Sequence, residues 1–143
     1  MMAIINEKEF EITDGILHHK ENVDLLPANI ELSALEVTMG NVMSRELIMK
    51  EYIEAVENEV RLILIDCMPS LGLMTINALV AADSVLIPVT GGLPFRVKGL
   101  QQLIHTIAMV KKRLNRKLIF EGILLTMVDF RTNYAKDVAG KSA

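Results

Sequence analysis

The chain has 143 residues, of which 51% are hydrophobic and 23% are charged, and its formal net charge is −3. This apolar fraction excludes an intrinsically disordered chain, and the length suffices for the core of one domain. The single cysteine, Cys67, excludes a disulfide scaffold and, with no recognisable secretory leader, predicts a cytoplasmic protein. No apolar run reaches the roughly 18 residues of a membrane-spanning helix, so we expect no membrane association.

Acidic and basic residues are divided unevenly along the chain. Residues 1–61 contain thirteen acidic and five basic side chains, a net charge of −8, whereas residues 62–143 contain five acidic and ten basic ones, a net charge of +5. The asymmetry fits either a basic binding face or merely two ends of one fold. The global charge argues against a dedicated nucleic-acid binder, whose domain is usually strongly basic.

The beginning of the chain predicts short elements. Residues 1–14 show no periodicity, and we expect them to be irregular. His18 and His19 follow a turn signal, and we expect them in a loop. Because they are adjacent in sequence, their side chains would not lie on one face of a helix or strand, and we expect no metal site there. Val23–Leu26 is a short strand-like run.

Two helices are expected next. Helical spacing of apolar residues begins at Asn29, and a second helical pattern follows Ser44. Serine is a favoured N-cap residue, because its hydroxyl accepts a hydrogen bond from an otherwise unpaired N–H of the first turn. We therefore expect Ser44 to cap the second helix.

The remainder alternates strand-like runs with helical patterns. In chain order these are Leu62–Ile65, Leu73–Ala82, Val85–Ile87 (stopped by Pro88), Val97–Leu114, and a strand region formed by Leu118–Phe120 and Gly122–Val128. The first run is aliphatic without alternation, which is typical of a strand covered on both faces. The order predicts a βαβαβ arrangement in one layered unit, an α/β fold with a parallel sheet flanked by helices.

Asp66 stands directly after the first aliphatic run. Ligands of open α/β sheets bind beyond the carboxyl ends of the strands. P-loop nucleotidases use a carboxylate at this point to hold the water shell of Mg²⁺ opposite the phosphates. The alternative is that Asp66 only caps a helix or lies in a loop.

Eight segments of the chain together carry a family pattern: Leu25–Leu32, Leu62–Gly72, Met74–Leu79, Ala81–Val85, Ile87–Val89, Lys98–Leu100, Gly122–Asp129 and Arg131–Asn133. Taken in this order, they resemble the ParA/Soj partition ATPases of the ParA/MinD superfamily. The resemblance is collinear from about Gly15 to Val138. It predicts a partial P-loop NTPase domain over residues 15–138, followed by a flexible tail at 139–143.

The resemblance implies a site, cofactors and partners. Asp66 occupies the Walker B position and would hold Mg²⁺ through water, and Thr126 would line the base side of ATP. A ParB-like protein and nonspecific DNA would be the partners, and ATP would drive formation of a homodimer on DNA. The loop residues expected near the nucleotide are Cys67, Met68, Pro69, Ser70 and Gly72.

Two departures from the family pattern bear on activity. The chain contains no glycine-rich loop of the Lys-Gly-Gly-x-Gly-Lys-Thr kind, which cradles phosphates, and it stops soon after Arg131-Thr132-Asn133. We therefore expect a truncated partition protein without competent ATP hydrolysis, so whether it is an enzyme stays open. The alternative is a non-catalytic interaction or dimerisation remnant unrelated to segregation. With its neighbouring strand missing, the edge at Leu62–Ile65 would be open, and the chain would be marginally stable or pair that edge with another chain.

Three other features suggest chemistry. Cys67 beside Asp66 is expected to be a small buried residue rather than a nucleophile, because the carboxylate raises the thiol pKa. Residues 135–142 formally fit a relaxed phosphate-loop pattern, but no strand precedes them, so no phosphate site is expected there. Five cations either complement a helix dipole or contact DNA phosphates. They are Lys111, Lys112, Arg113, Arg116 and Lys117.

Overall fold

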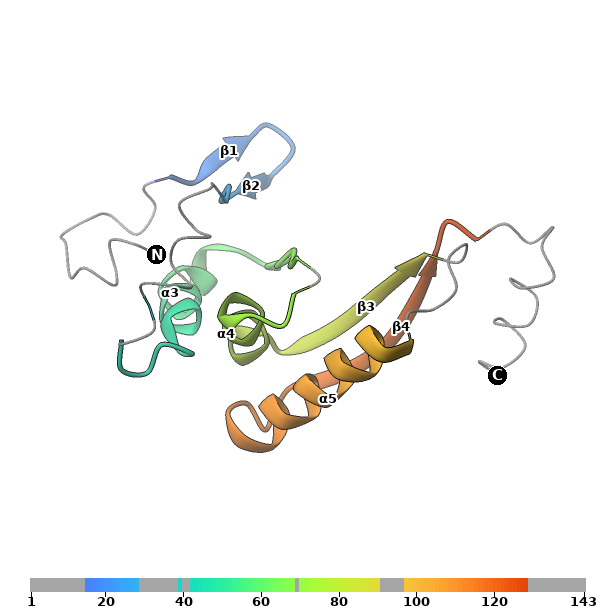
Figure 1. Ribbon diagram of the computed structural model, residues 1–143. Helices are drawn as coiled ribbons and strands as arrows, with labels where there is room; N and C mark the ends of the chain where they lie inside the picture. Colours follow the sequence, from blue (N-terminus) through green and yellow to red (C-terminus); the bar gives the residue numbers. More distant parts are fainter. Residues whose placement is uncertain (1–14, 29–38, 40–41, 69, 91–96, 129–143) are drawn as a thin grey trace. The chain divides into compact units, whose positions relative to one another are not determined.

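The computed structural model describes residues 15–28, 39, 42–68, 70–90 and 97–128 (Figure 1). The chain divides into two compact units, Met1–Ala82 and Asp83–Ala143, and each is described by itself. The elements of the first unit are β1 (Leu17–His19), β2 (Val23–Leu25), α3 (Ile48–Val56), the 3-10 helix η2 (Glu57–Glu59) and α4 (Leu73–Ala81). Those of the second unit are β3 (Ser84–Thr90), α5 (Val97–Arg113) and β4 (Ile119–Thr126).

Strands β1 and β2 form an antiparallel hairpin. The strand predicted at Val23–Leu26 is confirmed for its first three residues, but the predicted loop histidines are wrong, since His18 and His19 lie in β1. His18 faces Asp24 across the hairpin, and its Nδ1 lies 2.8 Å from Asp24 Oδ1. Sequence spacing did not indicate this cross-strand pair. Side-chain pairs of this kind stabilise the pairing of such short strands.

Helices α3 and α4 contact each other in the first unit. The buried side chains around them are Met39, Ile48, Thr75, Asn77, Ala78, Leu79 and Val80. Helix α4 confirms the prediction for Leu73–Ala82 almost residue for residue. The helix expected from Asn29 lies at residues 29–38, outside the described residues.

The prediction that Ser44 caps the second helix is wrong. Ser44 adopts a left-handed φ of 54°, and α3 starts after Leu47 without a side-chain cap from its own N-terminal residue. Ser44 instead closes a turn, in which its carbonyl accepts a hydrogen bond from the Leu47 N–H at 2.8 Å. The capping role passes to Asn77, a side chain distant in sequence, whose Oδ1 accepts from the Met49 N–H.

The segment Leu62–Ile65 is not a strand, contrary to the prediction. It is aliphatic, but within the described part of the chain no strand pairs with it. Leu62 is 75% exposed and Leu64 is 86% exposed. The expectation of a strand covered on both faces therefore fails here, because a strand requires a hydrogen-bonded neighbour and none is supplied by the residues described.

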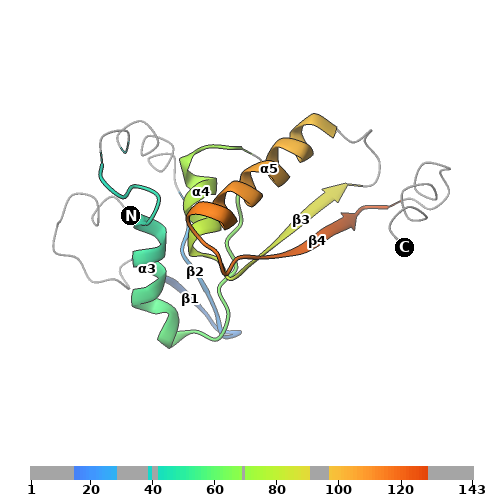
Figure 2. The same cartoon turned by 90° about the horizontal axis from the view of Figure 1, so that it is seen from below.

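The second unit is a βαβ arrangement. Strands β3 and β4 pair in parallel, and α5 makes the crossover between them and lies alongside both strands in two orthogonal views (Figure 1, Figure 2). The two predicted runs on either side of Glu121 join into one strand. An irregularity in register falls between Val85 and Leu86, opposite the stretch that contains Gly122, whose φ is +138°.

Among the described residues of this unit, α5 covers one face of the β3–β4 pair and no helix or strand covers the other (Figure 1, Figure 2). The buried hydrophobic residues described in this unit are Ile87, Ile107, Val110 and Leu118, so α5 covers the side of β3 that carries Ile87. Leu86 and Leu124, on the other side, are about half exposed. Pro88 lies inside β3 rather than ending it. A proline is tolerated at this position because β4 is the one described strand that pairs with β3, so the other edge of β3 requires no N–H donor. The predicted α/β class with a parallel sheet and flanking helices is confirmed.

Within the described residues, no helix is long and apolar enough to cross a membrane.

Candidate functional site

Asp66 directly follows the aliphatic segment Leu62–Ile65 and is exposed. Its carboxylate forms no hydrogen bond or ion pair with any other described residue, so both oxygens are available to water or a cation. Mg²⁺ keeps several of its waters and is commonly bound through one or two carboxylates together with substrate phosphates. The donor chemistry of Asp66 fits that requirement, although no three His, Cys, Asp or Glu side chains of the described residues cluster to hold a metal on their own.

A short loop connects Asp66 to helix α4. Cys67 and Met68 are exposed, and the Ser70 N–H donates to the Met68 carbonyl oxygen at 2.7 Å. Gly72 is the N-cap residue of α4, and its carbonyl accepts from the Ile76 N–H at 3.2 Å. Pro69 lies outside the described residues. The candidate loop residues that are described therefore lead directly into a helix N-terminus, where backbone N–H groups and the helix dipole favour an anion.

Cys67 is exposed, and the prediction that it is a small buried residue is wrong. The predicted direction of its pKa is confirmed: partial desolvation of the sulfur, and then the neighbouring Asp66 carboxylate, raise the pKa of the Cys67 thiol. The Sγ atom lies 3.9 Å from the Ile65 carbonyl oxygen, to which it donates weakly. A raised pKa reduces the thiolate fraction at neutral pH, which argues against a nucleophile here.

Thr75 ties the loop to the helix, and sequence reasoning gave it no role. Its hydroxyl donates to the Ser70 carbonyl oxygen at 2.8 Å and lies 3.4 Å from the Ser70 hydroxyl. Thr75 is 7% exposed, whereas Ser70 is half-buried. The hydroxyl thus holds the end of the loop against the first turn of α4.

Asn77 is the other buried polar residue of α4 that sequence reasoning passed over. It is completely buried, and its Nδ2 donates to the carbonyl oxygens of Arg45 at 2.9 Å and Leu73 at 3.0 Å. Its Oδ1 accepts from the Met49 N–H at 3.1 Å, so Asn77 caps the N-terminus of α3 from another helix. An asparagine on the apolar stripe of a helix was the available signal, since a buried amide requires partners.

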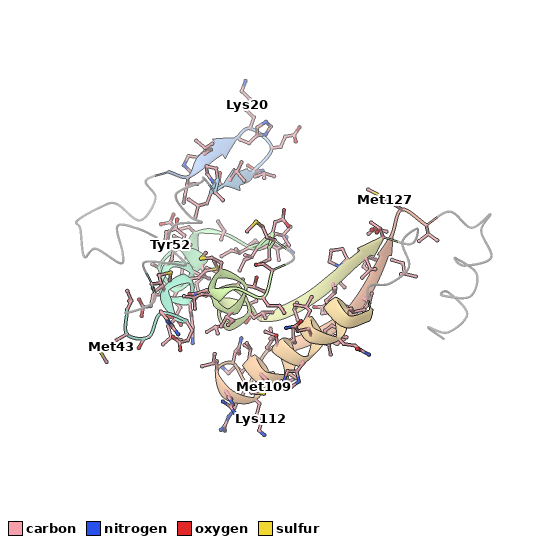
Figure 3. All side chains as sticks on the ribbon, viewed as in Figure 1. Lys20, Met43, Tyr52, Met109, Lys112 and Met127 are labelled. Atoms are coloured by element: carbon pink, nitrogen blue, oxygen red, sulfur yellow. The ribbon has the colours of Figure 1, made fainter. Side chains whose placement is uncertain are left out.

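The other predicted site residues lie in the second unit. Thr126 ends β4, is half-buried, and donates through its hydroxyl to the Val89 carbonyl oxygen at 3.3 Å, so it ties the two strands together. The five predicted cations are all exposed at and after the end of α5, where Figure 3 shows Lys112 projecting outward. None of the five forms an ion pair with another described residue. Lys111, Lys112 and Arg113 occupy the last turn of the helix, where positive charge also complements the helix dipole.

Comparison with known proteins places the chain in a family. A family model described as an AAA domain matches residues 1–120. The chain is 50% identical over 113 residues to the sporulation initiation inhibitor protein Soj of Bacillus subtilis, an alignment that covers 79% of this chain and 44% of Soj. It is 43% identical over 138 residues to the chromosome partitioning protein ParA of Myxococcus xanthus, covering 95% of this chain and 47% of ParA.

The fold agrees with a solved structure. Cobyrinic acid a,c-diamide synthase from Mycobacterium smegmatis, crystallised with an ATP analogue and magnesium, matches with a TM-score of 0.88 and 30% identity, covering 97% of this chain and 56% of the synthase. The chain spans a little less than half the length of Soj and ParA. The predicted ParA/MinD-like α/β fold is confirmed, and the chain belongs to the AAA-domain family, with partition proteins of the Soj and ParA type among its relatives.

Proposed function

We propose that the chain is part of a ParA-type partition protein and contributes Asp66 to the binding of Mg²⁺·ATP. The observation that carries the proposal is the exposed Asp66 carboxylate, which has no hydrogen-bond or ion-pair partner among the described residues and lies between an aliphatic segment and the loop that leads into α4. The relatives support it, because one is named a chromosome partitioning protein and a structural neighbour was crystallised with an ATP analogue and magnesium.

In this proposal the residues of the first unit have separate roles. Asp66 orients the water shell of Mg²⁺, and the metal supplies neutralisation of phosphate charge when it is bound. Cys67, Met68, Ser70 and Gly72 are proposed to lie near the phosphates, as is Pro69, which lies outside the described residues. The Thr75 hydroxyl holds the Ser70 end of the loop. The role of Thr126, lining the base side of the nucleotide, rests on the family resemblance alone.

We propose that the 143-residue chain by itself binds Mg²⁺·ATP weakly and does not hydrolyse it. Its sequence contains no glycine-rich loop with lysines, the motif that provides most of the backbone donors and the positive charge for the phosphates. A single carboxylate acting through water supplies a small part of the binding energy. Nucleotide contacts should therefore be detectable at millimolar concentrations, without turnover.

An NMR titration with Mn²⁺·ATP tests this proposal, because paramagnetic broadening reports even weak binding near the metal. The amides of Cys67 and Ser70 should broaden selectively, and Asp66→Asn should abolish the effect. Asp83→Asn is the matched control, since it removes the same charge from another exposed aspartate. Broadening that survives Asp66→Asn, or that spares the loop, would refute the role of Asp66; phosphate release above background would refute the absence of turnover.

The exposed cations are proposed as the DNA-contacting surface, and a ParB-like protein as a second partner. Five exposed side chains without ion-pair partners among the described residues form a dense positive patch at the end of α5. Such a patch attracts the phosphate backbone without reading sequence. The ParB-like partner rests on the family resemblance alone.

A non-catalytic interaction module is the second candidate function. The observation that favours it is the exposed aliphatic segment Leu62–Ile65, together with the missing phosphate-binding loop. Absence of all selective Mn²⁺·ATP broadening, combined with stable self-association, would favour this candidate over the first.

A further inference from the structure

Neither α3 nor α4 begins with a side-chain cap of its own. Leu47, the N-cap residue of α3, and Gly72, the N-cap residue of α4, provide no side-chain hydrogen bond to the first turn. Upstream of α3, Ser44 has a left-handed φ of 54°, which residues with a Cβ adopt at an energetic cost. The first N–H groups of a helix have no partner within the helix. The first turns of α3 and α4 therefore depend on contacts from elsewhere in the unit.

Thr75 holds the first turn of α4. It is the third residue of the helix, and its hydroxyl donates to the Ser70 carbonyl oxygen at 2.8 Å. Ser70 is held in turn, since its N–H donates to the Met68 carbonyl oxygen at 2.7 Å. Thr75 is 7% exposed, so water competes little for its hydrogen bond. The loop after Asp66 and the first turn of α4 are thus joined through this hydroxyl.

Asn77 joins the same turn of α4 to α3. Its Nδ2 donates at 3.0 Å to the carbonyl oxygen of Leu73, the first residue of α4, and its Oδ1 accepts from the Met49 N–H at 3.1 Å. Thr75 and Asn77 are two positions apart, about 200° around the helix axis, so they reach opposite sides of α4. Hydrogen bonds therefore connect the loop at Ser70, through the first turn of α4, to the first turn of α3.

We propose that α4 couples the loop after Asp66 to the start of α3, with Thr75 and Asn77 as the positioning residues. When the loop separates from Thr75, the first turn of α4 opens and the Leu73 carbonyl no longer holds the Asn77 amide. The Met49 N–H then loses its cap, so a change in the loop changes the stability of the first turn of α3. The coupling goes beyond the proposed function and stands without it, because its tests are made without nucleotide or Mg²⁺.

Amide hydrogen exchange at Met49, measured by NMR, tests the coupling from the loop side. Thr75→Val removes the hydroxyl but nearly keeps the shape of the side chain. It should accelerate exchange at Met49 by about 3- to 10-fold, as the loss of one buried hydrogen bond implies. Thr75→Ser keeps the donor and should retain most of the unmodified rate. Thr106→Val is the matched control and should leave Met49 unchanged, since the Thr106 hydroxyl also donates to a helix carbonyl, that of Gln102 in α5, at 3.0 Å.

Two comparisons separate the coupling from a general loss of stability. Val80 lies buried in the second half of α4, and its amide reports opening of the whole unit. In Thr75→Val, exchange should accelerate more at Met49 than at Val80. In an Asn77→Ala background, where the cap is already lost, Thr75→Val should accelerate Met49 no further. Equal acceleration at Met49 and Val80, an unchanged Met49 rate in Thr75→Val, or additive effects of the two substitutions would each overturn the proposal.

A new cap on α4 tests the route through its first turn without removing any hydrogen bond. Gly72 has φ −73° and ψ 177°, extended backbone angles that a serine N-cap residue also adopts. Gly72→Ser should therefore stabilise the first turn of α4 and slow exchange at Met49 by about twofold. In Thr75→Val the same substitution should bring the Met49 rate back towards the unmodified value. A Met49 rate that Gly72→Ser leaves unchanged in both chains would overturn the proposal, even where Asn77→Ala does not fold.

Discussion

Replacing Asn77 by alanine should destabilise the first unit more than any exposed substitution of the same kind. The side chain is completely buried and makes three hydrogen bonds, to Arg45 O, Leu73 O and Met49 N–H. Losing the cap on α3 costs about 1 kcal/mol, and the buried bond to Arg45 adds a net contribution of about 1 kcal/mol. The Leu73 carbonyl lies within α4, so losing the Asn77 hydrogen bond to it changes the free energy of unfolding little. We expect a loss of about 2 to 3 kcal/mol in the free energy of unfolding.

Amide hydrogen exchange measured residue by residue is the appropriate assay, because the chain has two units that need not unfold together. Asn77→Ala should accelerate exchange throughout α3 and α4 by the factor that about 2 to 3 kcal/mol implies, about 30- to 150-fold, and most clearly at Met49. Asn58→Ala, at an exposed asparagine of η2, is the matched control and should change exchange less than about twofold. Equal effects of the two substitutions would refute the cross-helix cap.

Three further predictions concern other parts of the chain. The pH midpoint for alkylation of Cys67 should lie above that of an unstructured cysteine peptide, and Asp66→Asn should lower it, since one of the two causes of the raised pKa is removed; an unchanged midpoint would contradict the carboxylate's contribution. Gly122→Ala should cost about 1 to 3 kcal/mol in chemical unfolding, because alanine is strained at a φ of +138°, whereas Gly99→Ala within α5 should be neutral or stabilising. Replacing Lys112 and Arg116 by alanine should weaken DNA retention, and the slope of log affinity against log salt concentration should flatten by about one unit for each phosphate that the chain no longer neutralises. Lys20→Ala, in the first unit, is the control. Retention that does not fall with added salt would exclude phosphate binding.

The aliphatic periodicity located helices well because a helix carries its hydrogen bonds within itself. The apolar stripe over Val97–Leu114 and the short apolar run at Leu73–Ala82 became α5 and α4 with ends displaced by one residue. Strands were less predictable, since a strand exists only with a partner. Leu62–Ile65 has the composition of a buried strand but no described neighbour, whereas Leu17–His19, with little strand character, pairs with β2 through His18 and Asp24.

The candidate site likewise contains residues that the sequence could predict and residues that it could not. Asp66 could be proposed from its place after an aliphatic run, because that signal is local. The cap that Asn77 gives to α3 joins residues 28 positions apart, and no local pattern encodes it. Ser44 was the better cap on sequence grounds, but its left-handed backbone removed it from that role. Cys67 was expected to be buried from its residue type, whereas its exposure follows from the loop that carries it.

Competition between Mg²⁺ and Mn²⁺ at Cys67 tests the central claim most directly. With ATP present, Mn²⁺ should broaden the Cys67 amide signal, and excess Mg²⁺ should restore it in the unmodified chain, because both cations would share the site beside Asp66. In Asp66→Asn the signal should stay sharp throughout. Broadening that Mg²⁺ does not reverse, or that is equal in the two chains, would contradict the assignment of Asp66 to a magnesium–nucleotide site.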